Sequence, residues 1–217
     1  WKNDTAGWHA PWGSGFPGWH IECVAMSTRY LGKTFDIHAG GVDLIPIHHN
    51  NEIAEAEAAN AKPYVRYWLH NEFLTIEDQK ISKSLGNTVS LQQLRDRGIH
   101  PLAFRYWLLT AHYRQKANFT WEAIMASQTA LQRAWKTFVD LPQHGHVVSS
   151  YEEKFKAALY NDFNTAVALS LIWEVFKDNT VSDRDKRATI VQFDRVLGIG
   201  FLDIPQGVEK VALSVSS

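Results

Sequence analysis

The sequence predicts an α/β fold that gives way to an all-α region. Three observations carry this prediction: a strand, a glycine turn and a helix follow one another in residues 34–60, a polar stretch interrupted by glycine occupies residues 142–150, and helical patterning holds beyond it. With 217 residues and 45% hydrophobic content, the chain can bury a core without disulfides. Its single cysteine, Cys23, has no internal partner to form one.

The first part of the chain is expected to mix strands and helices. Residues 1–18 are rich in glycine, proline and tryptophan, which excludes a long regular element there. Aromatic and β-branched residues recur further along, in residues 67–76. The elements predicted here are a structured loop over 1–18, a helix over 19–30, a strand over 34–38 broken at 39–41, a helix over 48–60, and a strand within 67–76 that pairs back with 80–82.

The second part of the chain is expected to be helical. Ser90, Thr120 and Ser182 each stand where a side chain can cap a helix, and Gly98 and Gly198 can end one. The predicted helices cover 90–97, 101–113, 120–141, 151–159, 165–177 and 183–197. The predicted domains are 1–76, 77–141 and 151–204, followed by a tail over 205–217 that is expected to be poorly ordered.

Charge and hydropathy narrow the classes of function. The formal net charge is −1, with 22 basic and 23 acidic residues, so contact with a nucleic acid would need a local basic patch. No stretch approaches the roughly 20 apolar residues that cross a bilayer, and no leader opens the chain. One cysteine is compatible with a reducing compartment. We therefore expect a cytoplasmic protein without a membrane role.

One constellation suggests a metal site. His48 and Glu52 are four residues apart in a predicted helix and should share a face, and Cys23 can approach from the preceding helix. A thiolate, an imidazole and a carboxylate are suitable ligands for Zn²⁺. The alternative is that Cys23 is a small buried apolar residue and the histidines are a solvated helix start.

Two further segments suggest nucleotide chemistry. Asp43 follows Gly41 after a predicted strand, where an open α/β sheet binds ligands, although a tight turn with a capping Asp explains the same pattern. Residues 80–87 place Lys80 and Lys83 among small hydroxyl residues and a glycine. An ammonium there could neutralise charge that builds on a triphosphate, or the segment could be an ordinary polar loop.

Taken in order, these segments resemble cysteinyl-tRNA synthetases, class I ligases that join cysteine to its tRNA. The resemblance covers nearly the whole chain. Its motifs are Pro17-Gly18-Trp19-His20-Ile21-Glu22-Cys23, Phe35-Asp36-Ile37-His38, Gly40-Gly41-Val42-Asp43, His48-His49 with Asn51-Glu52-Ile53-Ala54, Tyr67-Trp68-Leu69-His70-Asn71, the KMSKS-like Lys80-Ile81-Ser82-Lys83-Ser84, Ala111-His112-Tyr113-Arg114, Asn161-Asp162 with Asn164-Thr165, and Phe193-Asp194-Arg195-Val196-Leu197-Gly198.

The resemblance implies a fold and a reaction. The fold is the second half of a class I Rossmann-like catalytic domain, then the KMSKS connective region, then a C-terminal helical bundle domain. The reaction is attack of L-cysteine on ATP, which carries Mg²⁺, to give cysteinyl-adenylate, followed by transfer to tRNA(Cys). The family's active-site zinc grips the substrate thiol, which separates cysteine from serine without editing.

The resemblance also assigns roles to residues. It implies zinc ligands at Cys23, His48 and Glu52, and a pocket for the amino acid lined by Trp19 and His38. Gly41 and Asp43 resemble the site for the nucleotide ribose. Lys80 and Lys83 belong to the ATP loop, and Lys83 resembles the lysine that stabilises the adenylation transition state.

Two family features find no match in the sequence. These are the HIGH motif that binds ATP phosphates and a further cysteine that is the fourth zinc ligand; both belong to the first catalytic half-domain. We therefore expect a monomeric synthetase of which this chain is one part, inactive by itself. A relative in the mycothiol pathway, which joins cysteine to an amino sugar, and a non-catalytic remnant that binds zinc or tRNA are the alternatives.

Overall fold

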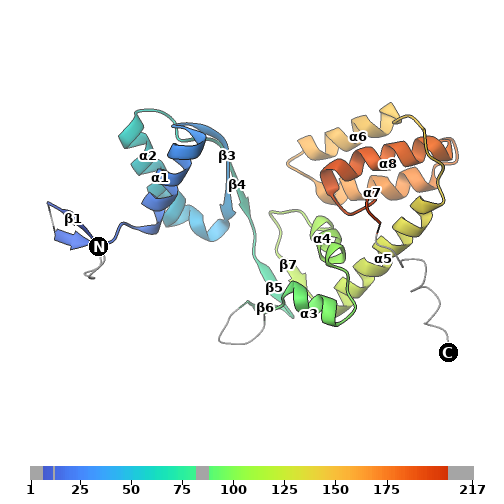
Figure 1. Ribbon diagram of the computed structural model, residues 1–217, viewed down its shortest axis with the longest axis horizontal. Coiled ribbons are helices and arrows are strands. Elements are labelled where there is room, and N and C mark those ends of the chain that lie inside the picture. The colour runs from blue at the N-terminus through green and yellow to red at the C-terminus, as the bar shows by residue number, and fades with distance from the viewer. Residues whose placement is uncertain (1–6, 12, 82–87, 205–217) are drawn as a thin grey trace. The chain divides into compact units, whose positions relative to one another are not determined.

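Strands alternate with helices in the first part of the chain, and helices dominate the rest, as the sequence predicts (Figure 1). The computed structural model describes residues 7–11, 13–81 and 88–204, with the exception of the Lys80 side chain. The chain divides into two units, Trp1–Phe73 and Leu74–Ser217. The finer domain boundaries predicted within residues 74–204 stay predictions, and the predicted tail lies outside the described residues.

The first unit is built around a parallel βαβ arrangement. Its elements are β1 (Trp8–Ala10), β2 (Gly13–Gly15), α1 (Trp19–Leu31), β3 (Phe35–Gly41), the 3-10 turn η1 (Val42–Leu44), the π-helix η2 (Ile45–His49), α2 (Asn50–Asn60) and β4 (Val65–Asn71). Strands β3 and β4 pair in parallel, so α2 is the crossover between them. Helix α1 packs on α2. Their shared core contains Val24, Phe35, Ala56 and Tyr64.

Three predictions for this unit were wrong in detail. The opening loop contains a short hairpin, β1 and β2. Glycine does not break β3, because Gly40 and Gly41 continue the pairing opposite His70 and Asn71. The helix predicted from His48 begins only at Asn50, after the π-helix η2.

The second unit joins a small sheet to a helical stack. Its elements are β5 (Leu74–Ile76), β6 (Gln79–Lys80), α3 (Leu91–Asp96), α4 (Pro101–Leu109), β7 (Ala117–Phe119), α5 (Trp121–Val139), α6 (Ser149–Tyr160), α7 (Thr165–Lys177) and α8 (Asp183–Leu197). The strand order is β6-β5-β7, with β5 and β6 antiparallel and β5 and β7 parallel. Helix α4 ends at Leu109, four residues before the predicted end at Tyr113.

The predicted helix caps are confirmed. Ser90 and Gln93 form a reciprocal capping box at the start of α3. The hydroxyls of Thr120 and Ser182 accept from backbone N–H groups in the first turns of α5 and α8. Gly198 ends α8 in the left-handed conformation, at φ 60°. These local signals therefore fix the helix boundaries well.

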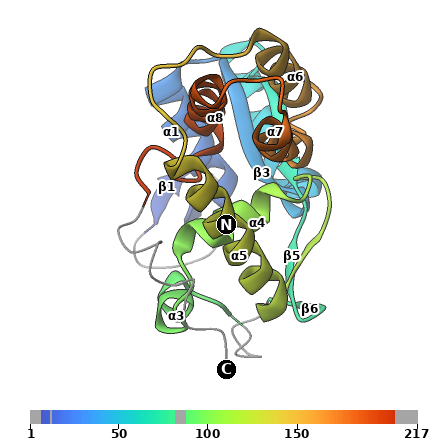
Figure 2. The ribbon, with the colours of Figure 1, turned by 90° about the vertical axis from the view of Figure 1, so that its right-hand side faces the viewer.

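Helices α6, α7 and α8 lie side by side and contribute to the largest core formed by the described residues (Figures 1 and 2). Trp135 of α5 is 1% exposed in this core. The rings of Phe155 and Phe193 stack at 4.2 Å between centroids. Among the described residues, every helix is too short or too polar to cross a bilayer.

Two carboxylates make the stability of the second unit depend on pH in the acidic range. Asp178 accepts hydrogen bonds from Thr180 and from the Tyr151 hydroxyl, and these hold its pKa below the usual value of 3.8. The backbone N–H of His146 and the Ser182 hydroxyl do the same for the pKa of Asp185. Because the folded pKa values are depressed, the stabilisation is complete above about pH 3.8 and is lost as pH falls through them.

We expect helical content, followed by circular dichroism from pH 6 to 2, to fall in that acidic window. The double variant Asp178→Asn, Asp185→Asn removes both titrations, so its stability should depend less on pH there. An unchanged pH dependence in the double variant would contradict this assignment.

Candidate metal and amino-acid site

Cys23, His48 and Glu52 meet as the sequence predicts. Cys23 lies in α1, His48 near the end of η2 and Glu52 in the first turn of α2. One potential ligand atom from each residue lies within 4.8 Å of the other two. His48 and Glu52 are buried and Cys23 is half-buried. The group therefore combines the sulfur, nitrogen and oxygen donors that suit Zn²⁺, with three of the four positions of a tetrahedral site.

The carboxylate of Glu52 tests whether a cation fits here. Its side chain is fully buried, and Oε1 lies 2.6 Å from Nε2 of His48. This contact is an ion pair only when His48 is protonated, and Oε1 has no hydrogen-bond partner among the described residues. A buried carboxylate oxygen without a donor is costly unless a cation compensates it. The two atoms are close enough to be ligands of one ion.

The other oxygen of Glu52 is held by surrounding groups. Oε2 lies 3.1 Å from Nε2 of His38 and accepts from the Tyr64 hydroxyl at 3.4 Å. The Ser27 hydroxyl is 2.6 Å from the same Tyr64 oxygen. Burial raises the pKa of Tyr64, which keeps its hydroxyl protonated and able to donate. Glu52 thus has one oxygen oriented by neighbours and the other left for a ligand, as supported metal ligands have.

Burial also sets the protonation of Cys23. The pKa of its thiol is raised, first by burial and then by the carboxylates of Glu52 and Glu22. Without a cation the sulfur therefore stays a thiol at neutral pH. A divalent ion beside it would reverse this preference, because metal binding displaces the thiol proton.

A second group of imidazoles lies against the first. His38, His49 and Glu52 also have potential ligand atoms within 4.8 Å of one another. Nδ1 of His49 is 2.7 Å from Nε2 of His70, and the rings of His38 and His49 meet edge-on at 5.0 Å. Burial, together with His38, His70 and His48, lowers the pKa of His49 to about 4. His49 is therefore neutral at physiological pH.

Trp19 and His38 both lie next to the three proposed zinc ligands. Trp19 opens α1 with its side chain 64% exposed, and its ring lies 4.4 Å from that of His48. His38 lies on β3 between Glu52 and the ring of Trp68, at 4.8 Å. Both side chains thus lie beside the proposed zinc ligands, and their role in binding an amino acid stays a prediction from the resemblance.

Gly41 and Asp43 lie at the carboxyl end of β3. Gly41 is the last residue of the strand, and Asp43 follows in η1 with its side chain exposed. A side chain on Gly41 would collide with Oδ1 of Asp43. The glycine thus leaves room for this carboxylate at the edge where open α/β sheets bind nucleotides.

The predicted ATP lysines fall at the limit of the described chain. Lys80 contributes its backbone to β6, opposite Thr75 of β5. Lys83 lies outside the described residues. Their roles therefore stay predictions from sequence.

Comparison with known proteins identifies the family. The model of the family described as tRNA synthetases class I (C) catalytic domain matches residues 1–129. The chain belongs to this class I synthetase family. The resemblance on which the sequence interpretation was built is thereby confirmed.

Curated relatives of this synthetase chain are cysteine–tRNA ligases. Cysteine–tRNA ligase 1 of Burkholderia lata is 46% identical over 212 residues, which are 94% of the chain and 45% of that protein. The cysteine–tRNA ligase of Novosphingobium aromaticivorans is 41% identical over 226 residues, 93% of the chain and 46% of that protein. The synthetase chain spans about half the length of these relatives.

A solved structure supports the fold. The LeuRS of Agrobacterium radiobacter, in a ternary complex with tRNA and LeuAMS, aligns with a TM-score of 0.61 at 16% identity. The alignment covers 76% of the synthetase chain and 26% of LeuRS. The predicted class I fold is thereby confirmed.

The structure adds site residues that the sequence interpretation did not single out. His49 and Tyr64 contact the proposed ligands or their neighbours, and His20 lies with Nδ1 2.7 Å from Oε1 of Glu55 on α2. His49 could have been suspected from its place beside His48. Tyr64 carried no signal, because only the βαβ packing brings residue 64 under Glu52.

The close approach of Gly40 to His49 predicts a steric effect. A Cβ atom on Gly40 would lie 2.6 Å from Cε1 and 2.9 Å from Nε2 of the His49 ring. Gly40→Ala should therefore displace this ring and lower stability by about 1–3 kcal/mol, as overpacking does. Thermal unfolding followed by circular dichroism measures this loss. The reverse change one residue earlier, Ala39→Gly, adds no atoms and is the control; equal stability of Gly40→Ala and the parent would refute the close packing.

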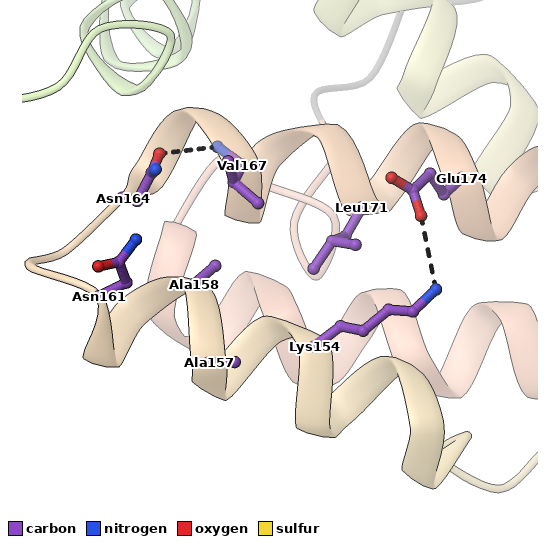
Figure 3. Close-up of a pocket in the computed structure, with 8 residues that line it drawn as sticks. All are labelled: Lys154, Ala157, Ala158, Asn161, Asn164, Val167, Leu171 and Glu174. Atoms are coloured by element: carbon purple, nitrogen blue, oxygen red, sulfur yellow. Dashed lines mark hydrogen bonds and ion pairs between the residues drawn. The ribbon is translucent and has the colours of Figure 1, made fainter.

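The second unit contains a separate pocket between α6 and α7. It has a volume of about 420 Å³, and Ala157, Ala158 and Leu171 form its apolar part. Asn161 and Asn164 stand at one end, and Lys154 and Glu174 pair across the other, 3.9 Å apart (Figure 3). The amide of Asn164 caps α7. This lining offers no metal-ligating cluster, unlike the imidazoles of the first unit.

Proposed function

We propose that the protein is a cysteine–tRNA ligase of the cytoplasm. It activates L-cysteine with Mg²⁺-bound ATP to cysteinyl-adenylate and transfers the cysteinyl group to tRNA(Cys). The observation that carries this proposal is the convergence of Cys23, His48 and Glu52, with one buried oxygen of Glu52 that has no hydrogen-bond donor in the described part of the chain. The names of the curated relatives point to the same reaction.

Zinc would be held by Cys23, His48 and Glu52, and when bound it supplies a cationic centre that prefers a thiolate to a hydroxyl. The protein's own groups prepare this position. His38 and Tyr64 orient Glu52, and Trp19 covers one side of His48. A pocket that distinguished cysteine from serine by packing alone would gain only about 1–3 kcal/mol. A sulfur-selective site therefore suits the task.

Gly41 and Asp43 are proposed to receive the ATP ribose, because an exposed carboxylate beside a strand end can accept from its hydroxyls. Lys80 and Lys83 are proposed to follow the phosphates, with Lys83 neutralising charge as the α-phosphate is attacked. The carboxylate of cysteine is the nucleophile, and pyrophosphate leaves.

The sheet of the first unit supports the proposal that a further half-domain completes the site in a monomeric enzyme. Parallel sheets are normally covered on both faces. Here Ile37 and Tyr67, which lie opposite each other on β3 and β4, are 55% and 68% exposed. This apolar surface would be covered by the first half of the catalytic domain, which would also bring the fourth zinc ligand and the phosphate-binding motif.

The test is cysteine-dependent exchange of pyrophosphate into ATP, with zinc content measured on the same sample. It is run on the chain alone and with the first catalytic half-domain of a cysteine–tRNA ligase supplied. We expect exchange only with both parts, and charging of tRNA(Cys) by the same mixture. Exchange without charging of tRNA would instead favour the mycothiol-pathway relative, and zinc binding without exchange in either sample would favour a non-catalytic remnant.

A further inference from the structure

The hairpin that leads into the lysine segment has a strained turn. Strands β5 and β6 are joined by the two residues Glu77 and Asp78, with φ angles of 48° and 61°. Hairpin turns with two positive φ angles normally use Asn-Gly or similar pairs, because side chains clash in this conformation. Neither residue is glycine. Something outside the hairpin must therefore hold this turn.

Asn118, on the neighbouring strand β7, holds it from the side. Its Oδ1 accepts from the backbone N–H of Asp78 at 2.8 Å and from the Thr75 hydroxyl at 3.0 Å. Its Nδ2 donates to the Asp78 carboxylate at 2.8 Å. The backbone N–H of Glu77 donates to the Phe119 carbonyl at 3.0 Å. One carboxamide thus ties Thr75 of β5, and the backbone N–H and carboxylate of Asp78, to β7.

The register of β5 and β7 explains why Asn118 reaches both Thr75 and Asp78. Strands β5 and β7 run in parallel with Thr75 opposite Asn118 and Ile76 opposite Phe119. The carboxamide therefore projects along the sheet toward the end of β5, where the turn begins. Phe119 is 2% exposed and belongs to a buried cluster with Leu94, Trp107 and Ile124, so β7 is a firm support.

We infer that Asn118 is a positioning residue for adenylation, because it fixes the turn that leads into β6, after which Lys83 follows in the sequence. An Asn-Gly turn would close this hairpin without strain or clamp. Strained turns persist where neighbouring structure determines them, and they cluster at functional sites. The turn lies directly before Lys80 in the sequence. The inference rests on the proposed function for its catalytic consequence and on the described hydrogen bonds for its structural one.

Two variants distinguish the hydrogen bonds that hold the turn from a general effect on stability. Asn118→Ala removes all three side-chain hydrogen bonds, and Thr75→Val removes only the one that does not involve the turn. Hydrogen exchange of the backbone amides of Asp78 and Gln79 should become about tenfold faster in Asn118→Ala, as loss of a hydrogen bond predicts. It should change little in Thr75→Val.

The catalytic measurement is cysteine-dependent pyrophosphate exchange by the chain with the first catalytic half-domain supplied. We expect Asn118→Ala to lower kcat by about 10–100-fold, as misplaced catalytic groups do, while KM for cysteine stays unchanged. Adding Glu77→Asn and Asp78→Gly to Asn118→Ala supplies a turn that needs no clamp, and should restore most of kcat. A merely structural role predicts neither the separation of kcat from KM nor this rescue.

The outcomes distinguish this inference from the proposed function. If the parent protein shows no cysteine-dependent exchange, the proposed function fails, and amide exchange alone decides whether Asn118 holds the turn. Unchanged amide exchange in Asn118→Ala overturns the clamp. An unchanged kcat in an active protein, or a loss that the relaxed turn does not restore, overturns the positioning role.

Discussion

Replacing Glu52 by Gln is expected to reduce zinc affinity by more than about 100-fold without destabilising the metal-free chain. Loss of a residue that only supports a metal ligand costs about 10–100-fold in affinity, so loss of a ligand should exceed this. The metal-free protein should keep or gain stability, because no described residue donates a hydrogen bond to Oε1, and a buried carboxylate oxygen without a donor is costly. The amide oxygen can still accept from Tyr64.

The two measurements are zinc titration against a chromophoric chelator and thermal unfolding of the metal-free chain. Glu55→Gln is the matched control, because Glu55 lies on the same helix and pairs with His20 rather than with the three proposed zinc ligands. A structural ion pair at Glu52 would give the opposite pattern, with the metal-free variant destabilised and zinc affinity unaffected. That result would remove the metal assignment.

Replacing Trp135 by Ala is expected to cost about 3–5 kcal/mol in the free energy of unfolding, the range for a large aromatic residue removed from a core. Trp135 is 1% exposed, and its Nε1 donates to the Ile199 carbonyl at 3.0 Å. Its ring also meets His100 edge-on at 5.5 Å. The residue therefore links α5 to both the start of α4 and the turn after α8.

Urea unfolding followed by circular dichroism measures this loss. Trp135→Phe keeps most of the apolar contact but leaves the Ile199 carbonyl without its donor, so it should cost less, about 1–3 kcal/mol. A cost below 1 kcal/mol for Trp135→Ala would show that the ring is not part of a tightly packed core.

The helix starts predicted at Ser90, Thr120 and Ser182 depended on local chemistry and were accurate for that reason. Ser90, Thr120 and Ser182 cap helices through their own hydroxyls, so their effect can be predicted without the tertiary structure. The end of α4 was placed too late, because its apolar pattern continues beyond Leu109. After that residue the backbone turns, and the hydroxyl of Thr110 donates to the Trp107 carbonyl.

Strand β3 shows the opposite case. Its glycines are poor strand formers alone, but pairing with β4 extends the strand through Gly41. The close contact between Gly40 and His49 accounts for one of these glycines, and it exists only after α2 returns the chain to β4. The end of β3 is therefore set by its pairing with β4 and could not be predicted from local strand propensity.

The candidate site divides in the same way. The three proposed zinc ligands followed from residue types and from the family resemblance, and their convergence agrees with both. His49, His70 and Tyr64 were not predicted. His49 lies beside His48 in η2, whereas the parallel pairing of β3 and β4 brings His70 and Tyr64 to the site. Asn118 was missed because its role depends on a register between strands that are distant in sequence.

The proposed ligands are close to one another in the sequence, and this has a consequence for biosynthesis. Cys23, His48 and Glu52 come from α1, η2 and α2, which follow one another with only β3 and η1 between. Contacts that close short loops form quickly, because little chain entropy is lost. A nascent chain that has released α2 and β4 from the ribosome already contains Cys23, His48 and Glu52 and the residues that surround them. The three proposed zinc ligands can therefore meet before the second unit has been synthesised.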